Sequence, residues 1–244
     1  MMRLKRLLLI DAVKWADVYE PGHRLRDVDG WFRRALGDDP TLSLQTCSIE
    51  ADLEAALNQE IDGVIISGSP RDAWSDDPAG LNLLHSLKIC ETRQVPVLGV
   101  CYGHQILARF LGGKVDRHPQ GLQLYTGTIH LRPEAMECPL FEGLGPSFPA
   151  ISGHADSVHS LPDGCQWLAE SKDTPVQAFR YENLFFGVQF HPEFTGEIIQ
   201  YLWSHRLETW RSTVNFDLGE RIDNLKDAPG TQHILTQFAR TVVT

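Results

Sequence analysis

The chain has 244 residues, 42% of them hydrophobic and 22% charged, with a formal net charge of −10 and a sequence pI of about 5.4. A soluble chain of this length can bury a core without disulfide or metal staples. The acidic balance argues against nucleic acid or an anionic membrane surface as the main partner. No apolar run is long enough to span a bilayer.

The first residues combine basic side chains with the apolar run Leu7–Ile10, as the start of a secretory signal does. The run is short, Asp11 ends it and no small-residue cleavage site follows closely, so we predict a buried first strand. The cysteines are odd in number, widely spaced and without zinc-ligand spacing, which favours a reducing, cytoplasmic compartment. No histidine pattern has ligand spacing, so we expect neither a metal site nor a cofactor. The cysteines are Cys47, Cys90, Cys101, Cys138 and Cys165.

Apolar runs and helical patterns alternate through the first half of the chain. Strands are predicted at residues 7–13, 42–49, 64–66 and 95–100, and helices at 30–36, 51–59 and 81–93. Continuous Val, Ile and Leu strands separated by helices indicate a parallel sheet that is covered on both faces. We therefore expect a three-layer α/β fold with a mostly parallel central sheet. Its working site should lie at the carboxyl ends of the strands, where the pattern places Ser67–Pro70 and Cys101.

The second half is richer in short strands with β-branched or aromatic residues. These are predicted at residues 125–131, 166–170, 176–181 and 184–190, and a helical pattern follows Thr195 as far as Trp210. Two more helical pieces, separated by Pro229-Gly230, make up the tail. We therefore divide the chain into one domain, residues 1–210, and a C-terminal helical extension, residues 211–244. The apolar face of the last helix packs on the domain or on a partner.

The segment Gly99–Gln105 directly follows a buried strand and carries a cysteine at its centre. A glycine two residues before Cys101 and another two residues after it leave room for the sharp strand-to-helix turn of a nucleophile elbow. Cys101 would then lie at a helix N-terminus, where free N–H groups and the helix dipole favour the thiolate. The pattern predicts a cysteine nucleophile.

A cysteine nucleophile needs a base, and the base needs a group that orients it. His191-Pro192-Glu193 follows the strand at residues 184–190. In an extended chain, residues two apart point to the same side, so Glu193 can hold the imidazole of His191 and stabilise its protonated form. This is the logic of a catalytic triad with Cys101 as the nucleophile.

An oxyanion hole needs two backbone donors beside the nucleophile. One is expected to be the N–H of Tyr102, the residue after the cysteine. We assign the second to the N–H of Ser69, in the loop that follows the strand at residues 64–66. Gly68 permits unusual dihedral angles there and shapes the loop.

Together these motifs resemble the triad type of class I glutamine amidotransferases. The likeness covers roughly residues 5–205: the oxyanion loop, the segment Gly99–Gln105, and His191-Pro192-Glu193 about ninety residues later. The resemblance implies a flavodoxin-like fold and a cysteine-dependent amidase. Its substrate would be glutamine or a γ-glutamyl compound, cleaved through a γ-glutamyl thioester on Cys101.

The resemblance also implies residues that bind the substrate. Residues 151–156 are similar to a stretch that lines the glutamine pocket of the GMP-synthetase glutaminase domain, which implies that His154 and Asp156 lie at the pocket. Asp156 would recognise the α-amino group, and Gln105 would also line the pocket. We expect His104 to be a wall or supporting residue, and the six scattered tryptophans to be core or surface residues.

Residues 67–73 depart from the common form of the family. Ser69 stands where many amidotransferases have glycine, and the loop is closer to stand-alone members, including plant γ-glutamyl peptidases, than to GMP synthetase. We expect no synthetase domain, because a helical tail follows the triad.

Two functions stay open: unaided hydrolysis of γ-glutamyl bonds, and supply of ammonia to a separate synthetase. A regulatory subunit with little turnover is a third alternative, against which the intact triad argues. A cysteine hydrolase or redox protein on a similar flavodoxin-like sheet is a fourth; His191-Pro192-Glu193 argues against a purely redox role, because no second cysteine lies near Cys101.

Overall fold

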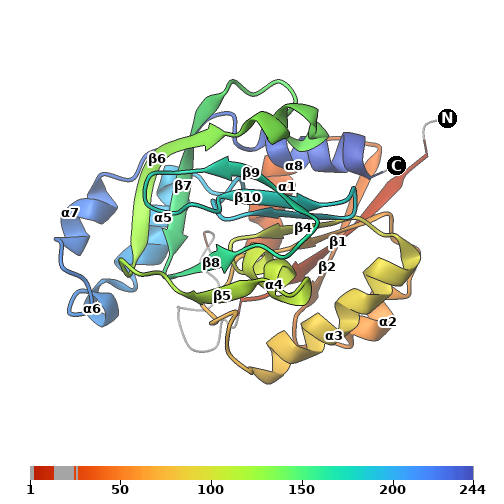
Figure 1. Cartoon of the computed structure of the whole chain (residues 1–244), viewed down its shortest axis with the longest axis horizontal. Coiled ribbons are helices and arrows are strands. Elements are labelled where there is room, and N and C mark those ends of the chain that lie inside the picture. Colours follow the sequence, from red (N-terminus) through yellow and green to blue (C-terminus); the bar gives the residue numbers. More distant parts are fainter. Residues whose placement is uncertain (1–2, 14–24, 26, 244) are drawn as a thin grey trace.

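The computed structural model describes residues 3–13, 25 and 27–243, and within these residues nine strands form one sheet (Figure 1). Its order is β2-β1-β3-β4-β11-β10-β9-β6-β7. The parallel part consists of β1 (Lys5–Asp11), β2 (Leu42–Ser48), β3 (Gly63–Ile66), β4 (Val97–Val100) and β11 (Phe185–Val188). The antiparallel part adds β10 (Ala178–Tyr181), β9 (Cys165–Glu170), β6 (Gln123–Leu131) and β7 (Ser147–His154). A separate antiparallel pair joins β5 (Lys114–Arg117) to β8 (Asp156–Ser160).

Helices cover both faces of the sheet. One face carries α2 (Leu53–Leu57), α3 (Pro78–Arg93) and α4 (Tyr102–Phe110). The other carries α1 (Val28–Leu36), α5 (Gly196–Ser204), α6 (Leu207–Trp210), α7 (Leu218–Asp223), α8 (His233–Gln237) and the π-helical turn η4 (Phe238–Val242). Two 3₁₀ turns, η2 (Pro133–Glu137) and η3 (Pro139–Phe141), precede β7. No helix in the described part of the chain is both long and apolar enough to cross a membrane.

The side chains of β1 show how the three layers form. Leu7 and Leu9 belong to one hydrophobic core, whereas Leu8 and Ile10 belong to the other. This alternation follows from the two-residue period of a strand. Because both faces are covered, the strand is a continuous apolar run in the sequence. The predicted three-layer α/β fold is confirmed.

Three strands of the structure are not predicted from the sequence: β5, β7 and β8. The segment of β7 contains Pro149 and Gly153, which are depleted in strands, yet it pairs with β6 over eight residues from Gln123 to His130. Tertiary pairing outweighs local propensity here. This strand matters for the site because it ends at His154, and β8 begins at Asp156.

The C-terminal helical segment is buried against the rest of the fold. Ile234, Leu235 and Phe238 are fully buried in the core that also contains Leu7 of β1. The Lys5 ammonium donates a hydrogen bond to the Arg240 carbonyl at 2.9 Å, which ties the first strand to the last turn. In Figure 1, α8 lies beside α1. The division of the chain at residue 210 stays a prediction.

Candidate active site

Cys101 occupies a strained turn between β4 and α4. Its φ of 50° and ψ of −98° are unusual for a residue with a Cβ. Its N–H donates a hydrogen bond to the carbonyl of Val188 at the end of β11, at 2.8 Å. The turn therefore holds the cysteine at the carboxyl ends of two neighbouring parallel strands, at the N-terminus of α4.

The two elbow glycines are required by close backbone contacts. A Cβ on Gly99 would lie 2.3 Å from the Gly103 carbonyl carbon, and one on Gly103 would lie 2.6 Å from the Ile66 carbonyl oxygen. Both distances are far below van der Waals contact. The glycines thus let α4 sit directly on β3 and β4, which sets the position of Cys101.

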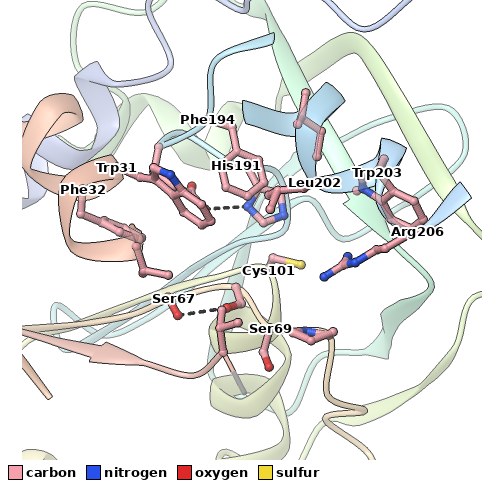
Figure 2. Close-up of a pocket in the computed structure, with 17 residues that line it drawn as sticks. Trp31, Phe32, Ser67, Ser69, Cys101, His191, Phe194, Leu202, Trp203 and Arg206 are labelled. Atoms are coloured by element: carbon pink, nitrogen blue, oxygen red, sulfur yellow. Dashed lines mark hydrogen bonds and ion pairs between the residues drawn. The ribbon is translucent and has the colours of Figure 1, made fainter. Parts of the chain in front are cut away.

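His191 and Glu193 form a buried pair beside Cys101. The imidazole Nδ1–H donates to the Glu193 Oε1 at 2.7 Å, as the two-residue spacing predicts, and both side chains are almost completely buried. The ring is also hydrogen-bonded to Cys101 and is stacked on Phe194, with ring centroids 4.1 Å apart. A Cβ on Gly68 would lie 2.7 Å from the His191 Cε1 and 3.5 Å from the Cys101 Cβ. The glycine therefore makes room for the contact between imidazole and cysteine (Figure 2).

The surroundings of His191 favour its protonated form. Burial alone would lower its pKa, but the negative charges of Glu193 and Cys101, with hydrogen bonds to both, raise the pKa of His191 to about 10. Charge–charge attraction is strong in such a site because little water screens it. A protonated imidazole beside the sulfur is the partner that a cysteine nucleophile needs.

The loop proposed to complete the oxyanion hole is held firmly. The Ser69 hydroxyl donates to the Ala12 carbonyl at 2.8 Å, and the Ala12 N–H donates to the Ser67 hydroxyl oxygen at 2.9 Å. Ser69 lines the cavities on both sides of Cys101. Tyr102 is the first residue of α4, so its N–H has no partner within the helix. The donor roles of Ser69 and Tyr102 stay predictions.

A polar cavity of about 420 Å³ opens on one side of Cys101. Gln105, His154 and Asp156 all line it, so the structure brings together the three side chains predicted to bind substrate. The Gln105 amide donates to the Asp156 carbonyl at 2.9 Å and to the Gln189 Oε1 at 3.1 Å. Burial lowers the pKa of His154 to about 3, so the ring is neutral and its Nδ1–H donates to the Asp156 carbonyl at 2.9 Å.

Asp156 is paired with a cation that the sequence did not single out. The Arg117 guanidinium lies 3.1 Å from the Asp156 carboxylate and 3.0 Å from that of Asp72. Burial raises the pKa of Asp156 to about 6, even though the charge of Arg117 opposes the shift. Arg117 comes from the short strand β5, whose local pattern gave no indication of the site. The cavity thus presents an anion and a cation side by side.

Other residues take positions that the sequence left open. His104 is fully buried against Phe179, 4.9 Å between ring centroids, and lines neither cavity. Trp31 and Trp203 belong to the hydrophobic core, as expected, and they also line a second, narrow cavity beside Cys101. Trp15 lies outside the described residues. Within the described ranges, no three His, Cys, Asp or Glu side chains are grouped so as to hold a metal ion.

Comparisons with known proteins identify relatives of this chain. The sequence model "Glutamine amidotransferase class-I" matches residues 36–200. Gamma-glutamyl peptidase 5 of Arabidopsis thaliana is 34% identical over 167 residues, which are 68% of this chain and 60% of that protein. The glutamine-hydrolysing GMP synthase subunit of Methanococcus vannielii is 34% identical over 169 residues, covering 67% of this chain and 82% of that one.

A solved structure extends the likeness to the whole fold. A glutamine amidotransferase from Thermotoga maritima has a TM-score of 0.73 at 18% identity, with 99% of both chains covered. The present chain spans about three fifths of the length of two curated γ-glutamyl peptidases that it matches, 60% and 59%. Since the family match spans more than half of the sequence, the chain belongs to the class-I glutamine amidotransferase family.

Proposed function

We propose that this protein hydrolyses the γ-amide of glutamine or of a γ-glutamyl compound through a thioester on Cys101. The observation that carries the proposal is the buried His191–Glu193 pair, 2.7 Å apart, against a cysteine in a strained elbow. A polar cavity beside the sulfur supports an amino-acid substrate. The names of the relatives, a γ-glutamyl peptidase and a glutamine-hydrolysing synthase subunit, support the same chemistry.

The first half of the reaction forms the thioester. The Cys101 thiolate attacks the amide carbon, and the carbonyl electrons move to the oxygen, which accepts hydrogen bonds from the N–H groups of Tyr102 and Ser69. The His191 imidazolium gives its proton to the amine nitrogen, the C–N bond breaks, and the amine leaves. In the second half, His191 takes a proton from water, the hydroxide attacks the thioester, and glutamate leaves as the thiolate re-forms.

The α-amino-acid end of the substrate would occupy the polar cavity. Asp156 is suited to the α-ammonium group, and Arg117, 3.1 Å away, to the α-carboxylate. The side chains of Gln105 and His154 donate hydrogen bonds to the backbone carbonyl of Asp156.

All five cysteines are free thiols, which supports a reducing, cytoplasmic location.

A panel of γ-glutamyl compounds tests the proposal. Purified protein is incubated with glutamine, γ-glutamyl peptides and γ-glutamyl alkylamides, and released glutamate is measured. We expect turnover of at least one compound, and a single adduct on Cys101 with a glutamine-mimic electrophile. Absence of both turnover and adduct across the panel would disprove the proposal.

Supply of ammonia to a separate synthetase is the second candidate function. It is favoured by the match to the GMP synthase subunit of Methanococcus vannielii, of which this chain covers 82%. In that case glutamine is the preferred substrate, and a synthetase partner raises the rate of glutaminase turnover. A free-standing hydrolase instead reaches its full rate alone.

The pH dependence of substrate binding is expected to report on Asp156. Its pKa of about 6 means that the carboxylate is charged at pH 7 and becomes neutral as the pH falls through 6. Because an ammonium group binds the charged form, KM should rise up to about tenfold for each pH unit below 6. Steady-state kinetics between pH 4.5 and 8 checks this. The variant Asp156→Asn should have a raised KM without this acid limb, and a limb that persists in the variant contradicts the assignment.

Removing the charge of Arg117 is expected to weaken substrate binding. The variant Arg117→Gln should raise KM about 10- to 100-fold with a much smaller change in kcat, since a charge-assisted hydrogen bond to the α-carboxylate is lost equally in ground and transition states. The control is Arg211→Gln, a residue of similar exposure (60% against 53%) that lines neither cavity. Equal KM values in the two variants would exclude Arg117 from binding.

A further inference from the structure

Cys101 stands between two cavities of different chemistry. The second cavity is narrow, and most of its lining is apolar (Figure 2). Its apolar walls come from α1, from α5 and from the loop after His191, and they include Val28, Trp31, Phe32, Phe194, Leu202 and Trp203. Each of these residues is at most 6% exposed. Trp31 meets Phe194 edge to face, 5.2 Å between ring centroids, so this wall is packed rather than loose.

The position of the proton donor tells which end of a substrate enters this cavity. Of the residues that the structure describes, His191 and Glu193 line the apolar cavity and not the polar one. In the proposed reaction His191 protonates the leaving nitrogen, so that nitrogen must lie within hydrogen-bond reach of the ring. The polar cavity, with Asp156 and Arg117, takes the glutamyl end. The substituent on the amine therefore extends toward the apolar cavity.

The volume of the cavity limits what that substituent can be. It offers about 50 Å³ to the centres of water-sized molecules. One water molecule needs about 10–15 Å³ of such space for its centre and occupies about 30 Å³ in the liquid. The cavity therefore has room for roughly three to five waters, which occupy about 100–150 Å³ as liquid. This is close to the size of one benzene molecule. An apolar cavity of this kind gains more from an apolar group than from water or a charged amine.

We propose that this cavity is an amine-side subsite, and that the protein prefers γ-glutamyl amides whose amine carries one phenyl-sized apolar group. The proposal rests on the function proposed above and names its substrate class. It predicts that ammonia and methylamine are poor leaving groups here because they leave the subsite unfilled. The apolar group occupies the subsite in the ground state and in the transition state alike, so it contributes to kcat/KM through binding.

The test compares γ-glutamyl amides that differ only in the amine. The compounds are γ-glutamyl-2-phenylethylamide, γ-glutamylmethylamide and glutamine, and glutamate release gives kcat/KM for each. We expect the phenylethylamide to exceed the methylamide by about 10- to 100-fold. If the methylamide or glutamine is hydrolysed at least as well, the subsite is disproved while the amidase function stands. If no compound is hydrolysed, the proposed function fails, and the subsite fails with it.

Two substitutions at one wall residue separate the subsite from a general effect on the enzyme. Leu202→Trp fills the cavity and should bring the phenylethyl-to-methyl ratio of kcat/KM close to one. Leu202→Ala widens it and should raise the rate for a naphthyl-sized amine relative to the phenyl one; this variant carries the test if the larger side chain prevents folding. The control Leu81→Trp changes a 42% exposed residue of α3 and should leave every ratio unchanged. A ratio that does not respond to either change at Leu202 contradicts the proposal.

Discussion

Replacing Cys101 with alanine is expected to lower kcat for glutamate release by about 10⁴- to 10⁶-fold. The thiolate supplies the electron pair of the new bond, and no other group described at the site can replace it. Loss of the nucleophile in a triad costs about as much as loss of the whole triad, so only the effects of binding and of the oxyanion donors remain. Fold should be little affected, because alanine keeps the Cβ and accepts the same φ of 50° at the same strain.

The measurement is initial rate on the best substrate of the γ-glutamyl panel, with mass spectrometry of the protein after treatment with the glutamine-mimic electrophile. The wild type should gain one adduct, and Cys101→Ala none. Cys47→Ala is the matched control: Cys47 is half-buried on β2, and burial raises its pKa, so its thiol is unreactive and its loss should leave kcat unchanged. Retention of more than about a hundredth of the activity by a folded Cys101→Ala protein would rule out the thioester mechanism.

The parts of the fold and site that the sequence predicts are those set by local spacing. The two elbow glycines indicate a turn that only glycine permits, and the Gly99 and Gly103 contacts of 2.3 and 2.6 Å show the reason. The spacing of His191 and Glu193 places both side chains on one side of an extended segment, where they meet at 2.7 Å. Buried parallel strands are recognisable because both of their faces must be apolar.

The parts that escape prediction depend on contacts between distant segments. Strand β7 is formed by pairing along β6, although Pro149 and Gly153 weaken its local pattern. Arg117 reaches Asp156 because β5 pairs with β8 at that position. Trp31 and Trp203 face the same cavity from two helices at opposite ends of the chain. These contacts join segments that are distant in the sequence, so no local pattern predicts them. The amine side of the site is therefore apparent only from the three-dimensional structure.

Replacing Glu193 with glutamine is expected to lower kcat by about 10³- to 10⁴-fold, although the shape of the side chain is kept. An amide oxygen can still accept the hydrogen bond from His191 but brings no negative charge to stabilise the imidazolium. The other carboxylate oxygen of Glu193, Oε2, has no hydrogen-bond partner among the described residues, so the charge of this carboxylate is directed to His191. The effect is therefore one of charge at a buried position, where water does little to screen it.

A pH profile distinguishes this role from a merely structural one. Glu193 is a main cause of the raised pKa of His191, about 10, so the variant should lower that pKa toward its ordinary value. The reactive form contains protonated His191; in the wild type it is lost only as the pH rises toward 10, whereas in Glu193→Gln it is lost at lower pH. The alkaline limb of kcat/KM should accordingly move to lower pH. The control Glu197→Gln removes the same charge from an exposed position four residues along and should leave the limb in place. An unmoved limb in Glu193→Gln, with a lowered melting temperature, would mean that Glu193 supports the fold and not the proton on His191.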